Sequence, residues 1–468
     1  MIFIDRGSST PLFEQIYDQF VRDILSGQLS SGTILPATRK LAEDLAVSRN
    51  TIDRAYQQLK AEGYVSSLTG SGFSVNDIPP RRQQPLPKPV APAKKPDTVQ
   101  PRYDFVYGSM SADLFPFRSW ARCTADVLAE LGNSPVISYP PRIGEPRLQE
   151  QLCDYLYESR DVRALPEQII ITCGHQHSME ILCNMFQSCE HFTMENPGYD
   201  GIREVFRNHN FRIHPISVEE DGISLEGVRE TSPGLLYLTP SHQFPSGSVL
   251  SVAKRRQLLD WADETGSWII EDDYDSELRY YTNPVPSMQS MDSTGRIIYC
   301  GTFSKSLSPA MRVAYMVLPP AAMVMFLDYY HRYNTQVSPL HQLVLAEFMK
   351  RGHYTRHINR LRTVYRKKIS SLLSAISDAF GDQVTVRGGD AGLHILMDVH
   401  TDLPQEELIA RAASEGIRLY PTRALYVPPL KCPEHELLLG FPTVPEEKFP
   451  QIMQKLVGLW GLDLRGKL

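Results

Sequence analysis

The sequence Trp-Ile-Ile-Glu-Asp-Asp-Tyr at residues 268–274 and the sequence Ile-Ile-Tyr-Cys-Gly-Thr-Phe-Ser-Lys at residues 297–305 decide the fold of most of the chain. Each begins as an apolar run of strand type and stops at carboxylate, phenol, hydroxyl or amine side chains. In an open parallel sheet, ligands bind at the carboxyl ends of the strands. The two stretches therefore predict an α/β domain with a binding site at these ends.

The side chains at these strand ends suit pyridoxal 5'-phosphate, a cofactor that forms a Schiff base with a lysine. Lys305 is the candidate for that lysine, and Asp272 is the carboxylate that would keep the pyridine nitrogen protonated so that the ring accepts electrons. Tyr274 would hydrogen-bond the ring hydroxyl. Hydroxyl donors and a guanidinium suit a phosphate dianion. The candidates for that role around Lys305 are Thr302, Ser304 and Arg312.

Two plainer interpretations compete with this one. A Ser-Lys pair after a strand is more often part of a solvated loop, and the acidic cluster at residues 271–273 could instead ligate Mg²⁺. However, the order carboxylate, tyrosine, lysine and arginine after apolar strands resembles the fold-type I pyridoxal phosphate enzymes, the aminotransferase family. This resemblance implies bound pyridoxal 5'-phosphate, Lys305 as the catalytic lysine and a homodimer. No metal site is expected.

The resemblance extends upstream of this region. Residues 169–172 form an apolar run that ends at a glycine, and a helix N-terminus reached through a glycine offers free N–H groups to a phosphate. Gly174, His175 and Gln176 are therefore the predicted phosphate-binding turn, as in the family. Tyr199 matches the aromatic residue that the family stacks on the pyridine ring.

Two positions depart from the pattern of ordinary aminotransferases. The family's asparagine beside the ring hydroxyl matches Phe244 here, within Ser-His-Gln-Phe-Pro-Ser-Gly at residues 241–247, so His242 and Gln243 are the candidates to replace it. The family's carboxylate-binding arginine, in an Arg-x-x-Phe context, is replaced by Leu-Leu-Gly-Phe at residues 438–441. Arg423 is the first substitute for binding the carboxylate of an effector or substrate, and Arg203 is the second.

The first 76 residues predict a separate, smaller domain. Apolar residues recur every fourth position through residues 12–24, a short helix is expected at residues 37–45, and Ser48 is the expected N-cap of a third helix. Two short helices with a tight connection fit a helix-turn-helix. Strand-like alternation on both sides of a turn at residues 69–72 predicts a β-hairpin wing.

Motifs in this segment resemble the GntR type of winged helix. They are Leu-Pro-x-x-Arg, Val-Ser-Arg-x-Thr and Ala-Tyr-x-x-Leu-x-x-Glu-Gly, in that order. The segment holds seven Lys/Arg and eight Asp/Glu, so any affinity for DNA depends on basic residues on the helices rather than on its net charge. A small helical protein-interaction module is the alternative. The candidate contacts to double-stranded operator DNA are Arg39, Ser48, Arg49, Thr51, Arg54, Thr69 and Ser71.

Composition and charge bound the remaining possibilities. A net charge of −6 argues against a protein that coats nucleic acid generally, and the seven cysteines form no Cys-x-x-Cys pair that would suggest zinc. No apolar stretch approaches ~18 residues and no signal peptide is recognisable, so we expect a cytoplasmic protein without a membrane partner. Residues 77–102 are rich in proline, which predicts an extended linker.

The predicted architecture is a winged helix-turn-helix, mainly α with a β wing, joined to an α/β fold-type I aminotransferase-like domain that has a smaller C-terminal α+β subdomain. In that smaller part, short strands are expected at residues 383–387, 393–399 and 437–441. The predicted segments are the winged helix at 1–76, the basic linker at 77–102, the large cofactor domain at 103–325, and a linking helix with the small domain at 326–468.

The fusion of these two domains resembles the MocR/GabR subgroup of GntR transcription regulators. By that resemblance, the chain is a regulator whose internal aldimine at Lys305 senses a small amine or amino acid and changes DNA binding. The alternative is a working pyridoxal phosphate-dependent aminotransferase with an accessory DNA-binding domain, in which Lys305 shuttles a proton. The same residues serve both, and net turnover is left open.

Overall fold

The computed structural model describes residues 2–68, 72–78, 101–132, 140–281 and 285–463. The chain divides into two compact units, Met1–Asp97 and Thr98–Leu468. Most of the predicted linker and the wing-tip candidates Thr69 and Ser71 lie outside the described residues. Among the described residues, no helix has both the length and the apolar character needed to cross a bilayer.

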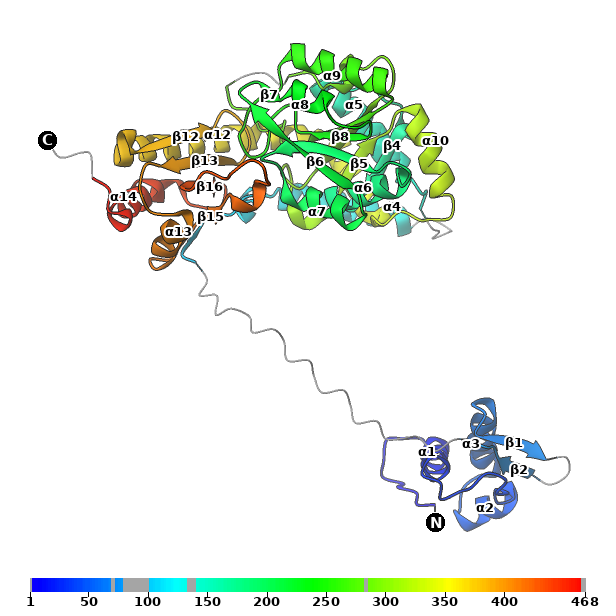
Figure 1. Ribbon diagram of the computed structural model, residues 1–468. Helices are drawn as coiled ribbons and strands as arrows, with labels where there is room; N and C mark the ends of the chain where they lie inside the picture. Colours follow the sequence, from blue (N-terminus) through cyan, green and yellow to red (C-terminus); the bar gives the residue numbers. More distant parts are fainter. Residues whose placement is uncertain (1, 69–71, 79–100, 133–139, 282–284, 464–468) are drawn as a thin grey trace. The chain divides into compact units, whose positions relative to one another are not determined.

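The N-terminal unit is a three-helix domain with a β-hairpin (Figure 1). Its core contains Ile16 and Phe20 from the first helix together with Ile52 and Tyr56 from the third, as their helical spacing predicts. Strands β1 and β2 pair antiparallel. The elements are α1 (Leu12–Leu25), α2 (Thr38–Asp44), α3 (Arg49–Ala61), β1 (Val65–Leu68) and β2 (Gly72–Val75). This is the predicted winged helix-turn-helix.

The larger unit is built on an eight-stranded sheet with the order β4-β11-β10-β9-β8-β5-β6-β7. Strands β10, β9, β8, β5 and β6 run parallel. Strand β11 is antiparallel to both β10 and β4, so β4 runs in the same direction as the parallel strands, and β7 pairs antiparallel with β6. The strands are β4 (Ile169–Thr172), β5 (His191–Asn196), β6 (Arg212–Glu219), β7 (Gly222–Ile223), β8 (Leu235–Leu238), β9 (Trp268–Asp273), β10 (Ile297–Thr302) and β11 (Ala314–Val317).

Helices cover both faces of this sheet, which is why its strands are apolar throughout (Figure 1). Successive residues of one strand enter different cores: Ile269 packs in the cluster with α9, and Ile270 packs in the cluster with α6 and α7. The helices of this layer are α4 (Phe117–Gly132), α5 (Pro146–Arg160), α6 (His175–Met185), α7 (Asp200–Asn208), α8 (Leu225–Arg229), α9 (Val252–Thr265), α10 (Pro320–Tyr329) and α11 (Pro339–Lys350).

The C-terminal part forms an antiparallel sheet with the order β12-β13-β16-β15, reached through the long helix α12 (His353–Phe380). The strands expected here are present, each displaced by about one residue. Their bounds are β12 (Val384–Gly388), β13 (His394–Val399), β15 (Tyr420–Pro421) and β16 (Glu436–Gly440), with helices α13 (Gln405–Ala413) and α14 (Phe449–Trp460) packed beside them.

The start of the larger unit is tied to this C-terminal part. Strand β3 (Tyr103–Asp104) pairs with β14 (Ile417–Arg418), and the Gly440 N–H donates to the Phe105 carbonyl at 2.8 Å. The predicted boundary between the large and small domains, at residue 325, falls inside α10. This helix packs with the large domain, because Ala322 and Phe326 are buried in the core of its sheet. The sequence pattern did not indicate either feature.

Candidate cofactor site and DNA-binding surface

A cavity of about 310 Å³ opens at the carboxyl ends of β8, β9 and β10. Because these strands are parallel neighbours, side chains far apart in the sequence meet there. The lining residues are Tyr107, Gly108, Ser109, His175, Gln176, Tyr199, Tyr237, Thr239, Phe244, Asp272, Tyr274, Thr302, Ser304, Lys305, Pro309 and Arg312. The cavity thus brings together most of the side chains proposed from sequence.

Lys305 follows β10 by three residues and enters this cavity half-buried. Its Nζ lies 4.0 Å from the centroid of the Tyr107 ring. A Cβ at Gly108, where φ is +89°, would meet Nζ, so glycine leaves room for the amine in its present position. Burial lowers the pKa of the Lys305 amine to about 8, although the carboxylates of Asp275 and Asp272 favour the charged form. Near neutral pH this amine is therefore a far better nucleophile than an exposed lysine.

Asp272 lies at the end of β9, beside β10, and is buried. Its Oδ2 accepts a hydrogen bond from the Tyr237 hydroxyl and lies 3.1 Å from His175 Nε2. Its Oδ1 is buried and has no hydrogen-bond partner among the described residues. Because a buried carboxylate oxygen without a donor is costly, this atom fits a cationic N–H donor such as a protonated pyridine nitrogen.

The phosphate candidates meet at the start of α6. Gly174 caps this helix with φ of +115°, and a Cβ there would overlap the guanidinium of Arg312. Close approach of a guanidinium to a helix N-terminus creates a cradle for an anion. Beside it, the Thr302 hydroxyl donates to Ser304 Oγ at 3.0 Å, and both side chains line the cavity.

Aromatic rings form the remaining wall. Tyr199 lies at the N-cap of α7 and meets Phe244 edge to face, with ring centroids 5.8 Å apart. Tyr274 also lines the cavity, and its hydroxyl donates to the His242 backbone oxygen at 2.9 Å. Both tyrosines are therefore placed beside the space that a pyridine ring would occupy.

His242 and Gln243 do not line the cavity, although the sequence made them candidates. His242 Nδ1 lies 2.8 Å from Asp275 Oδ2, and both side chains are buried. Gln243 Nε2 donates to the Pro197 carbonyl at 2.8 Å, so its amide holds a loop together. Both polar side chains thus bind groups outside the cavity, and the neighbouring Phe244 lines the cavity instead.

The two arginines proposed to bind a ligand carboxylate are also outside the cavity wall. Arg423 Nη1 lies 3.1 Å from Glu406 Oε1, and both side chains are largely exposed. Arg203 is buried and donates to the Ala424 carbonyl, while its Nε has no partner among the described residues. The structure gives neither side chain a contact with the space beside Lys305.

Of the acidic cluster at residues 271–273, only Asp272 faces the cavity. Glu271 accepts from the backbone N–H groups of Met288 and Gln289, and Asp273 forms a buried ion pair with Arg160 at 2.6 Å. Alternation along a strand sends neighbouring side chains to opposite faces. A shared magnesium site for the three carboxylates therefore does not fit this geometry.

Several lining residues were not proposed from sequence. Tyr107, Gly108 and Ser109 follow the short strand β3, where no periodic pattern marks a site. Tyr237 and Thr239 lie at the end of β8, and their polar groups at the end of an apolar run are the signal that could have identified them.

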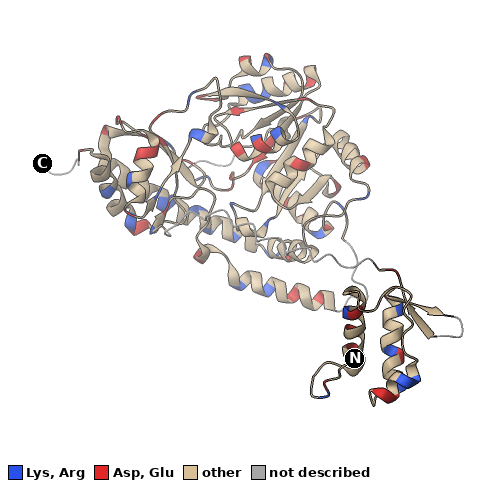
Figure 2. Ribbon diagram, turned by 60° about the horizontal axis from the view of Figure 1, so that its bottom comes forward, with Lys and Arg blue, Asp and Glu red and all other residues tan. Residues whose placement is uncertain are grey.

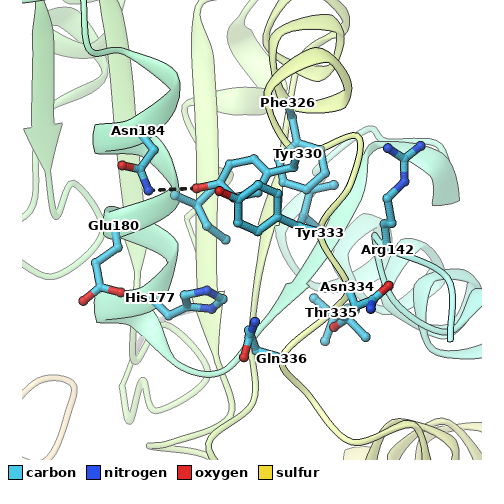
Figure 3. Close-up of a pocket in the computed structure, with 13 residues that line it drawn as sticks. Arg142, His177, Glu180, Asn184, Phe326, Tyr330, Tyr333, Asn334, Thr335 and Gln336 are labelled. Carbon is cyan, nitrogen blue, oxygen red and sulfur yellow. Dashed lines mark hydrogen bonds between the residues drawn. The ribbon is translucent and has the colours of Figure 1, made fainter. Parts of the chain in front are cut away.

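A second, smaller cavity of about 180 Å³ shares helix α6 with the first but none of its lining residues (Figure 3). His177, Glu180 and Asn184 reach into it from α6, and Tyr330 and Tyr333 face them from the chain that follows α10. Asn184 Nδ2 donates to the Tyr330 hydroxyl at 3.0 Å. No lysine is among its described lining residues, so it lacks the group for aldehyde chemistry.

The candidate DNA-binding residues of the first unit lie on α2, on α3 and at the α3 N-cap, where Figure 2 marks Lys and Arg in blue. Ser48 caps α3 by accepting from the Thr51 N–H at 3.1 Å. Arg49 lies 3.5 Å from Asp53, and the Arg54 guanidinium lies 3.9 Å from the centroid of the Phe13 ring. Arg39 is exposed at the start of α2.

Comparison with known proteins supports both halves of this description. Residues 12–75 match the bacterial regulatory proteins of the gntR family, and residues 107–456 match aminotransferase class I and II. The probable rhizopine catabolism regulatory protein MocR of Rhizobium meliloti is 34% identical over 94% of this chain and 92% of its own length. The chain belongs to the MocR-type regulators of the GntR family.

Other relatives of this MocR-type regulator agree with the assignment. The uncharacterized HTH-type transcriptional regulator YdeL of Bacillus subtilis is 38% identical over 98% of both chains. Among solved structures, the α-aminoadipate aminotransferase LysN of Thermus thermophilus, complexed with N-(5'-phosphopyridoxyl)-L-leucine, is 27% identical with a TM-score of 0.68, covering 76% of this chain and 92% of that one. The larger unit therefore has the aminotransferase fold.

Proposed function

We propose that this MocR-type regulator binds pyridoxal 5'-phosphate in the cavity around Lys305 and senses a small amine or amino acid there, which alters its affinity for operator DNA. The observation that carries the proposal is one cavity that combines Lys305, the unpartnered Oδ1 of Asp272 and the N-terminus of α6. The same chain carries a winged helix.

The residues present fit this cofactor. Pyridoxal 5'-phosphate supplies, when bound, an aldehyde that condenses reversibly with primary amines and a ring that accepts electrons. Asp272 Oδ1 would accept a hydrogen bond from the ring nitrogen and keep the proton there. Arg312 and the backbone of Gly174 and His175 would hold the phosphate. Tyr199 and Tyr274 would flank the ring, and Lys305 Nζ would provide the protein amine that a ligand amine displaces.

Displacement of Lys305 gives the ligand a means to act as a signal. A ligand shifts a conformational equilibrium only by the difference in its affinity for the two states. Movement of the Lys305 amine would change its contact with the Tyr107 ring and its electrostatic interaction with Asp275 and Asp272. DNA affinity is then expected to differ between the protein with its lysine linked and the protein with its lysine free.

The proposal is tested with full-length protein and DNA from upstream of its own gene. We expect a visible absorbance band from cofactor linked to Lys305, and a DNA affinity that changes when an amine ligand removes the lysine link. Lys305→Ala should lose the covalent link. Arg39→Ala should weaken DNA binding without changing the absorbance band, because it removes a candidate phosphate contact. Arg22→Ala, an exposed change on α1, is the matched control for DNA binding.

Two outcomes would contradict this function. A protein that stays colourless with excess cofactor, and whose Lys305 remains unmodified after hydride reduction, has no cofactor to sense with. Repeated conversion of an amine to a carbonyl product without specific DNA binding would instead favour the working aminotransferase.

The regulator is also proposed to form a homodimer. The resemblance to the aminotransferase family implies this assembly, and exposed apolar side chains on two helices of the larger unit are candidates for part of the interface. They are Phe117, Leu128 and Leu131 on α4, and Val324 and Leu327 on α10. Light scattering of the purified chain measures the assembly, and a monomer at micromolar concentration would contradict it. Because a regulator must reach the operator, we place it in the cytoplasm.

A further inference from the structure

The cavity around Lys305 offers no free cation for a ligand carboxylate. Among its described lining residues, the cationic side chains are Lys305 and Arg312, and His175 is paired with Asp272. In the proposed function Lys305 is the exchanging amine. Arg312 lies against Gly174 at the start of α6, where the cofactor phosphate would take it. A ligand carboxylate would therefore find Lys305, Arg312 and His175 each bound to another group.

The wall beyond the lysine presents aromatic rings to the cavity. Tyr107 and Phe244 line the cavity with ring centroids 4.8 Å apart. Leu438 packs in the same cluster as Phe244 and is only 6% exposed, and it lies opposite Leu396 across the β13–β16 pair. Leu438 thus packs behind the aromatic wall. His394 also lies there, with its ring centroid 4.9 Å from that of Tyr107 and 5.2 Å from that of Phe244, but its Nε2 lies 3.0 Å from the Pro245 carbonyl and its side chain does not line the cavity.

Arg387 and Arg203 do not line the cavity. Arg387 forms an ion pair with the buried carboxylate of Glu436, which also accepts from the Tyr426 hydroxyl at 2.9 Å. Arg203 is buried and donates to the Ala424 backbone carbonyl, while its Nε has no partner among the described residues. The charged groups that do lie close, Asp272 and the buried Asp275, are carboxylates and offer a ligand carboxylate no positive partner.

We infer that the ligand of this regulator is a primary amine with an uncharged, apolar or aromatic body and no carboxylate. The inference rests on the proposed function, since it describes what binds beside Lys305. Burying an unpaired carboxylate is strongly unfavourable, whereas an apolar body gains from contact with the rings of Tyr107 and Phe244. The neutral amine is the ligand class that these surroundings accept.

The test compares matched ligands on the full-length, cofactor-loaded protein. The pairs are 2-phenylethylamine with L-phenylalanine, 3-methylbutylamine with L-leucine, and pentylamine with 5-aminopentanoate, followed by the visible spectrum and by DNA affinity. We expect each amine to act at a concentration ~10-fold or more below that of its carboxylate partner. Equal or tighter binding of the carboxylate partners would overturn the inference, as would a coloured protein that responds to none of the six.

A variant pair tests the same point at Leu438. Leu438→Arg places a guanidinium behind the aromatic wall and should shift the preference toward L-phenylalanine by ~10-fold or more, whereas Leu438→Met should keep the wild-type preference. If Arg203→Gln in the wild-type background abolishes binding of L-phenylalanine, the carboxylate has a partner and the inference is wrong. A colourless protein would overturn the proposed function itself, which separates the two failures.

Discussion

The unpartnered Oδ1 of Asp272 leads to a specific prediction for the change Asp272→Asn. In the described structure, Oδ2 is held by Tyr237 and His175, whereas Oδ1 is buried without a donor. If Oδ1 is the partner of the cofactor's ring nitrogen, the bound cofactor forms a charge-assisted hydrogen bond there. Asparagine keeps the shape of the side chain but removes the charge that makes this bond strong.

The magnitude follows from the kind of bond that is lost. A hydrogen bond to a charged group contributes about 1.5–3 kcal/mol, so Asp272→Asn should weaken cofactor affinity roughly 10- to 150-fold. The protein without cofactor should not lose stability, because the substitution removes a buried charge that lacks a full set of donors. The loss therefore belongs to binding and not to folding.

The assay titrates cofactor-free protein with pyridoxal 5'-phosphate and follows the visible absorbance band. Tyr237→Phe serves as the comparison, because it removes the donor to Oδ2 and leaves Oδ1 unchanged. That variant keeps the bond between Oδ1 and the ring nitrogen, so cofactor affinity should fall only roughly 2- to 10-fold. Asp272→Asn with an affinity within about twofold of wild type would refute the assignment of Oδ1 to the ring nitrogen.

Three further predictions concern other parts of the chain. The rate at which cofactor-free protein captures pyridoxal 5'-phosphate should rise with pH and level off above the pKa of Lys305, about 8, because only the neutral amine reacts. Stopped-flow absorbance from pH 6.5 to about 10 measures this rate. A rate that still rises at about pH 10 would contradict the prediction. Gly174→Ala adds a Cβ that meets the Arg312 guanidinium at a residue with positive φ. It should weaken the affinity for pyridoxal 5'-phosphate ~10-fold or more and leave the affinity for phosphate-free pyridoxal unchanged, as equilibrium titration would show. Ser48→Ala removes the cap on the Thr51 N–H and should destabilise α3 by about 1 kcal/mol, seen as faster amide exchange in α3 of the full chain and absent in Ser48→Thr.

The parts of this protein that could be predicted from sequence are those where local chemistry and periodicity agree. Apolar runs that end in polar groups located Asp272, Thr302 and Lys305, because parallel strands place their ends side by side. The glycine before α6 could be identified for a similar reason, since Gly174 adopts a positive φ that other residues avoid. The winged helix followed from helical spacing and one cap, at Ser48.

The remaining site residues depend on contacts between distant segments. The sequence predicts His242 as a substitute for the asparagine that contacts the ring hydroxyl, but in the structure its ring pairs with Asp275, 33 residues away. Likewise, Arg423 lies in the right part of the chain, but its side chain turns to Glu406 on the surface. Side-chain direction is set by tertiary packing, which a spacing argument does not contain.

Tyr107 connects the beginning of the larger unit to the cavity around Lys305. The chain enters the larger unit at β3, which is fastened to β14 through the Tyr103 N–H to the Gly416 carbonyl at 3.0 Å. Only a few residues later, Tyr107 lies over the Lys305 amine at 4.0 Å. The segment that continues from the linker therefore reaches the reactive lysine before it reaches any helix of the larger unit. Because a cation–π contact requires a positive charge over the ring, any group that replaces the charged amine of Lys305 would alter this contact with Tyr107.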